Sequence, residues 1–165
     1  MKIAIVYYSL EGHTHFIAEK MGKQISGDLI RLIPKKDFPT GSFGKYFWGG
    51  KSATFHEKPK LSNEMLQLDS YDAIIVGTPT WAGTMAPPVR TFLAHAVIKG
   101  KPVYLFACNS GGDDKKCFAQ MHAYLKENTS MGCVSFTQPN EGNFDTLKGK
   151  FESFCKAVEE GKQYP

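Results

Sequence analysis

Three short runs of apolar residues constrain the fold of this chain more than any other feature. They occupy residues 3–7, 73–76 and 103–107. A run of this length without polar alternation is typical of a strand buried on both faces, as in parallel sheets. Stretches with apolar residues at helical spacing come between or after the strands, at residues 16–25, 89–97, 118–125 and 144–158. Alternation of buried strands with helices predicts a parallel sheet that is covered by helices on both faces.

Two further strands complete the pattern and have the character of sheet edges. Residues 29–33 are interrupted by Arg31 and ended by Pro34, and residues 133–137 alternate between apolar and polar side chains. Edge strands in these places fit the doubly wound order 2-1-3-4-5, in which ligands bind beyond the carboxyl ends of strands one and three. The sequence therefore predicts one α/β domain over residues 1–165, a three-layer sandwich around a five-stranded parallel sheet.

The apolar runs are too short to span a bilayer, and the chain enters its first strand at once instead of beginning with a secretion signal. Its four cysteines are scattered, without a CxxC pair or a histidine at metal-binding spacing. We therefore expect a cytoplasmic protein with reduced cysteines, no metal site and no membrane partner.

The net charge of +4 is concentrated in one segment between strands two and three. Residues 35–60 hold six lysines against Asp37 and Glu57, so this extended segment carries the whole excess. Nucleic-acid-binding proteins usually spread a denser basic face over a recognisable motif, so we expect no nucleic-acid partner. The segment suits an anionic ligand or an acidic partner protein better, and a solvated loop is the alternative.

The turn at residues 8–14, Tyr-Ser-Leu-Glu-Gly-His-Thr, joins the first strand to the first helix. Backbone N–H groups at a helix start are unpaired, and the helix dipole adds partial positive charge there. The hydroxyls of Ser9 and Thr14, with Gly12 between them, suit such a start to a phosphate or another dianion. An ordinary helix start capped by Ser9 or Thr14 is the alternative, and this turn alone does not decide between them.

Two later loops follow strands three and four and must converge on the same edge of the sheet. Residues 78–84 read Thr-Pro-Thr-Trp-Ala-Gly-Thr, and residues 108–113 read Cys-Asn-Ser-Gly-Gly-Asp. The first loop carries an indole, and the two glycines of the second let the backbone approach a flat ring closely. A phosphate site beside two such loops predicts a pocket for a mononucleotide with a planar head.

With these three loops, nearly the whole chain resembles the flavodoxin-like family of FMN-binding proteins. The turn at residues 9–14 resembles the phosphate loop of that family, although Glu11 and His13 stand where a hydroxyl residue and Asn are commoner. Residues 77–93 are particularly similar to flavodoxin-fold NAD(P)H dehydrogenases and related flavoproteins. Strand five runs directly into the last helix, so the chain resembles a short-chain form.

The resemblance implies FMN as the cofactor and assigns ligands to each of its parts, without a catalytic side chain. The phosphate would be held by the hydroxyls and backbone N–H groups of Ser9, Leu10, Glu11, Gly12, His13 and Thr14. The isoalloxazine ring would lie against Pro79, Thr80, Trp81, Ala82, Gly83 and Thr84. The pyrimidine side of the ring would contact Asn109, Ser110, Gly111 and Gly112.

Three functions follow from these observations. The first is an electron carrier that takes electrons from a redox partner protein and passes them to a protein or small-molecule acceptor. The second is an oxidoreductase that takes hydride from NAD(P)H for a quinone-type acceptor, with the basic segment attracting the dinucleotide. The third is a non-redox module that binds another phosphorylated ligand on the same turn. The sequence leaves the oligomeric state open between monomer and homodimer.

Overall fold

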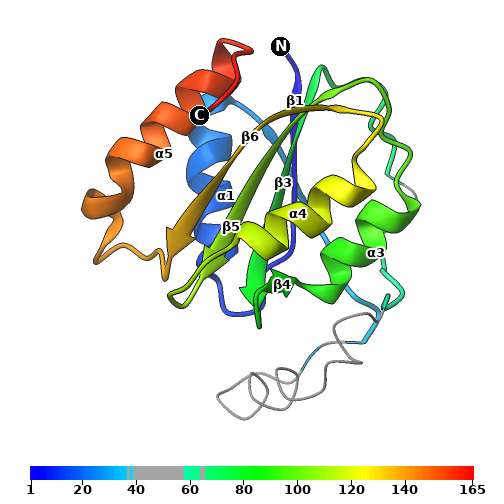
Figure 1. Cartoon of the computed structure of the whole chain (residues 1–165), viewed down its shortest axis with the longest axis horizontal. Coiled ribbons are helices and arrows are strands. Elements are labelled where there is room, and N and C mark those ends of the chain that lie inside the picture. Colours follow the sequence, from blue (N-terminus) through cyan, green and yellow to red (C-terminus); the bar gives the residue numbers. More distant parts are fainter. Residues whose placement is uncertain (37, 39–57, 64–65) are drawn as a thin grey trace.

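The computed structural model describes the chain except for residues 37, 39–57 and 64–65 (Figure 1). Its centre is a parallel sheet of five strands in the order β2-β1-β3-β5-β6. The strands are β1 (Ile3–Tyr7), β2 (Asp28–Arg31), β3 (Ala73–Trp81), β5 (Pro102–Asn109) and β6 (Thr129–Thr137). This is the doubly wound order predicted from the sequence, with β2 and β6 at the edges.

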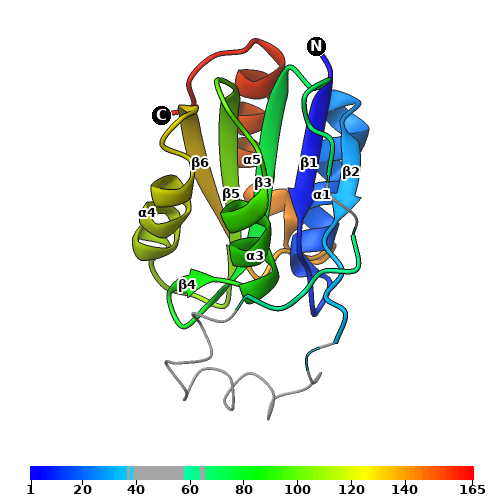
Figure 2. The ribbon, with the colours of Figure 1, turned by 90° about the vertical axis from the view of Figure 1, so that its right-hand side faces the viewer.

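Two pairs of helices cover the two faces of the sheet, which makes the predicted three layers (Figure 2). On one face lie α1 (His13–Ile25) and α5 (Phe144–Glu159), and on the other lie α3 (Pro87–His95) and α4 (Lys115–Tyr124). The pair Pro87 and Pro88 begins α3, as predicted for a first turn whose N–H groups have no partner in the helix.

The apolar runs of the sequence are explained by the two cores that these helices create. Successive side chains of a strand point to opposite faces. Ile3, Ile5 and Tyr7 of β1 therefore pack in the core under α1 and α5, while Ala4 and Val6 pack in the core under α3 and α4. A strand that serves two cores has no face left for polar residues.

The prediction of residues 78–84 as a loop was wrong, because β3 continues to Trp81 and a short antiparallel strand, β4 (Thr84–Met85), pairs with it. The two residues between the strands have positive φ angles, 48° at Ala82 and 74° at Gly83. A type I′ turn requires positive φ at both of its central residues, and the twist of such a turn matches that of the strands it joins. The sheet thus has a sixth strand that the sequence pattern missed.

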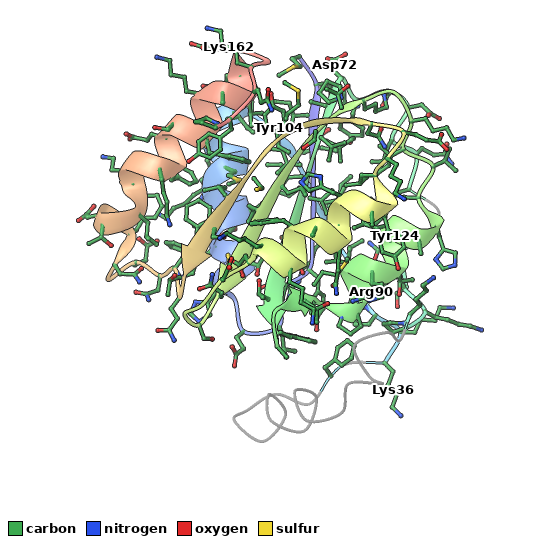
Figure 3. The ribbon with its side chains drawn as sticks, viewed as in Figure 1. Lys36, Asp72, Arg90, Tyr104, Tyr124 and Lys162 are labelled. Atoms are coloured by element: carbon green, nitrogen blue, oxygen red, sulfur yellow. The ribbon has the colours of Figure 1, made fainter. Side chains whose placement is uncertain are left out.

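The two ends of the basic segment lie together beside the sheet. Pro34 and Leu61 form an isolated antiparallel bridge, and the backbone N–H of Lys35 donates to the carbonyl of Lys60 at 2.8 Å. Lys36 lies at the same end of the molecule as the carboxyl ends of the strands, opposite Asp72 and Lys162 (Figure 3). The greater part of the predicted segment 35–60 lies outside the described residues. None of the helices described is long and apolar enough to cross a membrane.

Candidate functional site

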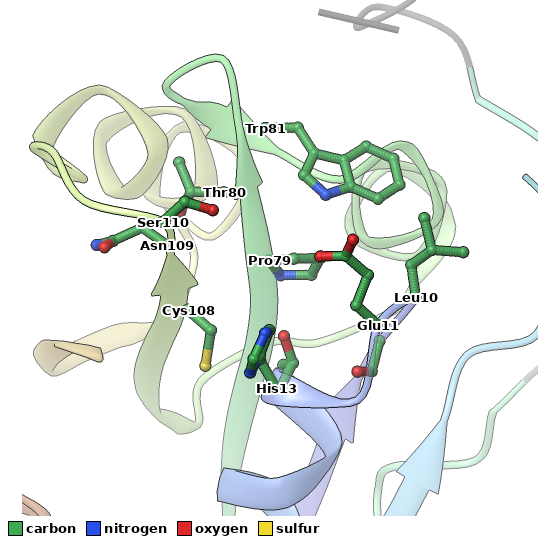
Figure 4. Close-up of a pocket in the computed structure, with 11 residues that line it drawn as sticks. Leu10, Glu11, His13, Pro79, Thr80, Trp81, Cys108, Asn109 and Ser110 are labelled. Carbon is green, nitrogen blue, oxygen red and sulfur yellow. The ribbon is translucent and has the colours of Figure 1, made fainter. Parts of the chain in front are cut away.

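A pocket opens at the carboxyl ends of β1, β3 and β5, where the sequence predicted a ligand site (Figure 4). The space in it that is free of protein atoms is about 390 Å³, a value that includes open solvent. All three predicted loops contribute to its wall. The lining residues are Ser9, Leu10, Glu11, His13, Thr14, Pro79, Thr80, Trp81, Cys108, Asn109 and Ser110.

Ten of the sixteen predicted ligands therefore share one pocket, and six do not line it. The six are Gly12, Ala82, Gly83, Thr84, Gly111 and Gly112. Thr84 lies 5% exposed, and its hydroxyl bonds to Gln120 and receives a hydrogen bond from Arg90. At Gly111 and Gly112, with φ angles of 113° and 128°, a Cβ atom would meet nothing within 4 Å. The role of all sixteen residues as cofactor ligands stays a prediction.

The start of α1 presents an uncapped helix end to this pocket. Gly12 occupies the N-cap position with a φ of 98° and, as a glycine, offers no side chain to cap the first turn. The Ser9 hydroxyl instead accepts from the N–H of Gly12 at 3.2 Å, one residue ahead of the helix. The capped helix start left open by the sequence is therefore not formed, and the first-turn N–H groups are available to an anion.

Thr14 provides a second, independent indication of a ligand. It is 1% exposed and lines the pocket, and among the described residues its Oγ1 has only the weakly polar thiol of Cys108 beside it. The buried Oγ1 of Thr80, another lining residue, likewise has only the thiol of Cys117 beside it. A buried hydroxyl without a partner costs about 1–3 kcal/mol. Both hydroxyls fit a polar ligand that completes their hydrogen bonding, as a phosphate would at Thr14.

His13 is held in the pocket wall by a contact that the sequence did not predict. Its Nδ1 lies 2.8 Å from the carbonyl oxygen of Pro139, in the loop after β6. A carbonyl oxygen only accepts, so Nδ1 must carry the proton and Nε2 is the remaining site for a ligand. The two residues are 126 positions apart, and no local signal in the sequence connects them.

Trp81 is fixed by an aromatic cluster on the side of the pocket. Its ring meets Tyr8 edge-on at 5.9 Å and Phe38 edge-on at 5.6 Å between centroids. Phe38 is one of the described residues of the basic segment, and this one side chain supports the pocket wall. Leu10 and Pro79 line the pocket with Trp81, which gives this side the apolar, flat character that suits a planar ring.

Asn109 ties the third loop to its surroundings. Its Oδ1 accepts from the N–H of Gly111 and from the hydroxyl of Thr137, both at 3.0 Å. Its Nδ2 donates to the buried carboxylate of Asp114 at 2.6 Å. The side chain thus fixes the loop, and Ser110 at the exposed tip is left to face a ligand.

Cys108 is a lining residue that the sequence reasoning did not select. It is 4% exposed, and burial raises the pKa of its thiol to about 12, partly offset by the neighbouring Thr14 hydroxyl. The thiol is therefore neutral at physiological pH and contributes an apolar surface. Glu11, by contrast, is exposed and brings a carboxylate to the pocket wall (Figure 4).

Comparison with known proteins identifies the family and the fold of the chain. The flavodoxin family model matches residues 2–135, more than half of the chain. A protein of Bacteroides uniformis described as a flavoprotein superimposes with a TM-score of 0.75 at 17% identity, over 90% of this chain and 97% of that one. A Lactobacillus acidophilus flavoprotein in complex with FMN gives 0.66 at 21% identity, over 89% and 98%.

A flavodoxin, WrbA-like protein from Agrobacterium tumefaciens covers 98% of this chain and 99% of its own, with a TM-score of 0.61 at 19% identity. At such identities these structures show a common fold, and the family match carries the assignment. The chain belongs to the flavodoxin family.

Proposed function

We propose that this protein binds FMN non-covalently in the pocket at residues 9–14 and transfers electrons through it. The observation that carries the proposal is the buried hydroxyl of Thr14, which has only the Cys108 thiol beside it, at a helix start whose N-cap residue is glycine. A phosphate placed there would receive the first-turn N–H groups and the Thr14 hydroxyl together. Membership of the flavodoxin family and the FMN complex of the Lactobacillus acidophilus neighbour support the same ligand.

The ring of the cofactor would lie between the second and third loops. Trp81 offers an aromatic surface held by Tyr8 and Phe38. Ser110 and the bare backbone of Gly111 and Gly112 offer polar groups without side chains in the way. FMN supplies the redox chemistry when bound, while the protein orients it and limits access to it.

A second candidate, an NAD(P)H-dependent quinone-type oxidoreductase, is favoured by a second hollow beside α3. This hollow has an empty volume of about 840 Å³ and shares no lining residue with the first. Lys35 and Lys60 bring positive charge to it, and Leu61, Leu66 and Phe92 give it apolar walls. A surface that is both basic and apolar suits an anionic dinucleotide better than it suits a basic protein partner.

The third candidate, a non-redox phosphate-binding module, predicts a colourless protein. The lining residues Leu10, Pro79 and Trp81 argue against it, because a phosphate alone would leave this apolar part of the pocket unexplained. Four free cysteines support the cytoplasm as the setting. We propose a redox protein or NAD(P)H as the donor, and a protein or small molecule as the acceptor.

The test is an absorbance spectrum of the purified protein with added FMN, followed by titration with NADPH and NADH. A stoichiometric flavin spectrum that remains after gel filtration supports FMN binding, and its absence refutes the proposal. Rapid oxidation of either dinucleotide with a quinone present supports the enzyme. Slow direct oxidation, combined with fast electron uptake from a flavin reductase, supports the carrier.

A further inference from the structure

We propose that Arg31 supplies a fixed positive charge to the phosphate turn at residues 9–14, so that it favours FMN over the same flavin without a phosphate. This inference rests on the proposed FMN site and adds a specificity residue to it. Arg31 does not line the pocket. It would therefore act through the turn, which its side chain reaches from the neighbouring strand.

The guanidinium of Arg31 is bound to the backbone of the turn. Its Nη2 donates to the carbonyl oxygen of Ser9 at 2.9 Å. Ser9 is 2% exposed and lines the pocket, and its hydroxyl accepts from the N–H of Gly12 at 3.2 Å. Arg31 thus holds the first residue of the turn by its backbone, while the side chain of that residue closes the turn. A carbonyl oxygen carries partial negative charge, and a charged donor bound to it offsets the repulsion that it would exert on an anion.

The backbone of β2 fixes the position from which Arg31 reaches the turn. This strand lies beside β1 at the edge of the sheet, and Arg31 stands opposite Tyr7 in the parallel register (Figure 2). The N–H of Leu32 donates to the Tyr7 carbonyl at 2.7 Å, and the carbonyl of Arg31 accepts from Asn63 at 2.9 Å. Because hydrogen bonds hold the strand on both sides, the side chain extends from a defined place at the carboxyl end of β1.

No salt bridge among the described residues neutralises Arg31. A guanidinium stays protonated throughout the pH range in which proteins are folded, so this charge is permanent. Its influence reaches the end of β1, where burial raises the pKa of the Tyr7 hydroxyl while the charge of Arg31 lowers it and that of Glu19 raises it. An anion bound at the turn that follows β1 would therefore meet a net attraction from this side chain.

Two carboxylates also belong to the surroundings of the site. Glu11 is part of the turn, and Asp114 is buried behind the third loop, where it accepts from Asn109 at 2.6 Å. Both are the same in every variant described below. A comparison between variants at position 31 therefore isolates the contribution of the guanidinium.

The ligand chemistry that such a charge selects is a phosphate monoester. The phosphate of FMN is mostly a dianion above about pH 6, whereas riboflavin has the same ring and no phosphate. Arg31 is exposed, so its attraction is modest and is screened by salt. The screening length falls from about 10 Å at 0.1 M salt to about 3 Å at 1 M. The effect should therefore be confined to the phosphorylated ligand and decrease with ionic strength.

The test measures the Kd of FMN and of riboflavin near pH 7.5 in wild type, Arg31→Gln, Arg31→Lys and the matched control Lys23→Gln. Glutamine removes the charge and lysine keeps it, while Lys23→Gln removes an equal charge from the last turn of α1. We expect Arg31→Gln to raise the Kd of FMN roughly three- to fivefold at about 0.1 M salt and less than about twofold at 1 M. Arg31→Lys and Lys23→Gln should stay within about twofold of wild type, and riboflavin should bind all four proteins alike.

Four results would overturn the inference while leaving FMN binding intact. They are an unchanged Kd of FMN in Arg31→Gln, equal weakening of FMN and riboflavin, a ratio that does not fall at high salt, and an Arg31→Lys protein as weak as Arg31→Gln. Failure of all four proteins to bind FMN at either salt concentration would instead refute the proposed function, and the inference with it.

A readout that needs no flavin uses ¹H–¹⁵N NMR of the apoproteins with inorganic phosphate as the probe. In wild type, phosphate should shift the N–H signals of Gly12, His13 and Thr14, and half of the shift should be reached at a lower phosphate concentration than in Arg31→Gln. Unchanged signals elsewhere in the spectrum would show that the variant keeps its fold. Equal half-saturation in the two proteins, or no shift at the turn, contradicts the proposal.

Discussion

Replacing Thr14 by valine should weaken FMN binding and stabilise the apoprotein at the same time. Valine keeps the shape of threonine and removes the hydroxyl, which is buried and has only the Cys108 thiol beside it in the described structure. Loss of a hydrogen bond to a charged phosphate costs about 1.5–3 kcal/mol, or roughly a 10- to 150-fold increase in Kd. Because only a weakly polar thiol satisfies this buried hydroxyl, its removal should raise the free energy of unfolding of the apoprotein by at most about 1–3 kcal/mol.

Thr91→Val provides the matched control. Thr91 is also buried, at 8% exposed, but its hydroxyl donates to the carbonyl of Pro59 at 2.8 Å. This variant should lose about 1 kcal/mol of unfolding free energy and keep its FMN affinity. Urea unfolding of the apoproteins and titration of FMN measure both quantities. A Thr14→Val protein with unchanged Kd and lowered stability would refute the assignment of this hydroxyl to a ligand.

Three further predictions concern the scaffold and its thiols. Gly132→Ala should destabilise the protein by about 1–3 kcal/mol in urea, because φ is 111° and the new Cβ would lie 2.3 Å from the Tyr164 carbonyl oxygen. Gly149→Ala, inside α5 with open space around it, should instead stabilise it by about 0.5–1 kcal/mol; equal effects of the two changes would contradict this. Burial raises the thiol pKa of Cys108, Cys117 and Cys155 to about 12. The folded state therefore favours the neutral thiols, and the stability that they contribute should be complete below about pH 9 and be lost as the pH rises toward 12. A melting temperature that is constant over that range in wild type, or that falls equally in the triple alanine variant, would count against these pKa shifts.

The elements that the sequence predicted correctly are those whose pattern is local. The runs at residues 3–7 and 103–107 are apolar because each strand serves two cores, and this leaves a direct trace in the sequence. The helix α3 begins at the two prolines that indicated its first turn, and α5 begins at Phe144, the first residue of its apolar spacing. The buried runs indicate which strands are central in the sheet. The doubly wound order then places the ligand site at the carboxyl ends of strands one and three, so the position of the site could also be predicted.

The features that the sequence did not predict depend on contacts between distant segments or on unusual backbone angles. The β3–β4 turn requires Ala82 to adopt a φ of 48°, which alanine rarely does. The bond between His13 and Pro139 joins residues 126 positions apart. Asp114 stands at the N-cap of α4, but its carboxylate accepts from Asn109 and makes no cap hydrogen bond, and Asp113 accepts from the N–H of Lys115 instead. In each case the residue type is compatible with several roles, and the structure around the residue determines which role it takes.

A crystal structure of the protein grown with FMN tests the central claim most directly. The account predicts phosphate density at the start of α1, within about 2.5–3.2 Å of Thr14 Oγ1 and the first-turn N–H groups. It predicts the ring beside Trp81 and the loop at residues 109–112. Phosphate density at any other place, or fully loaded crystals in which Thr14 Oγ1 still has no ligand partner, would contradict it.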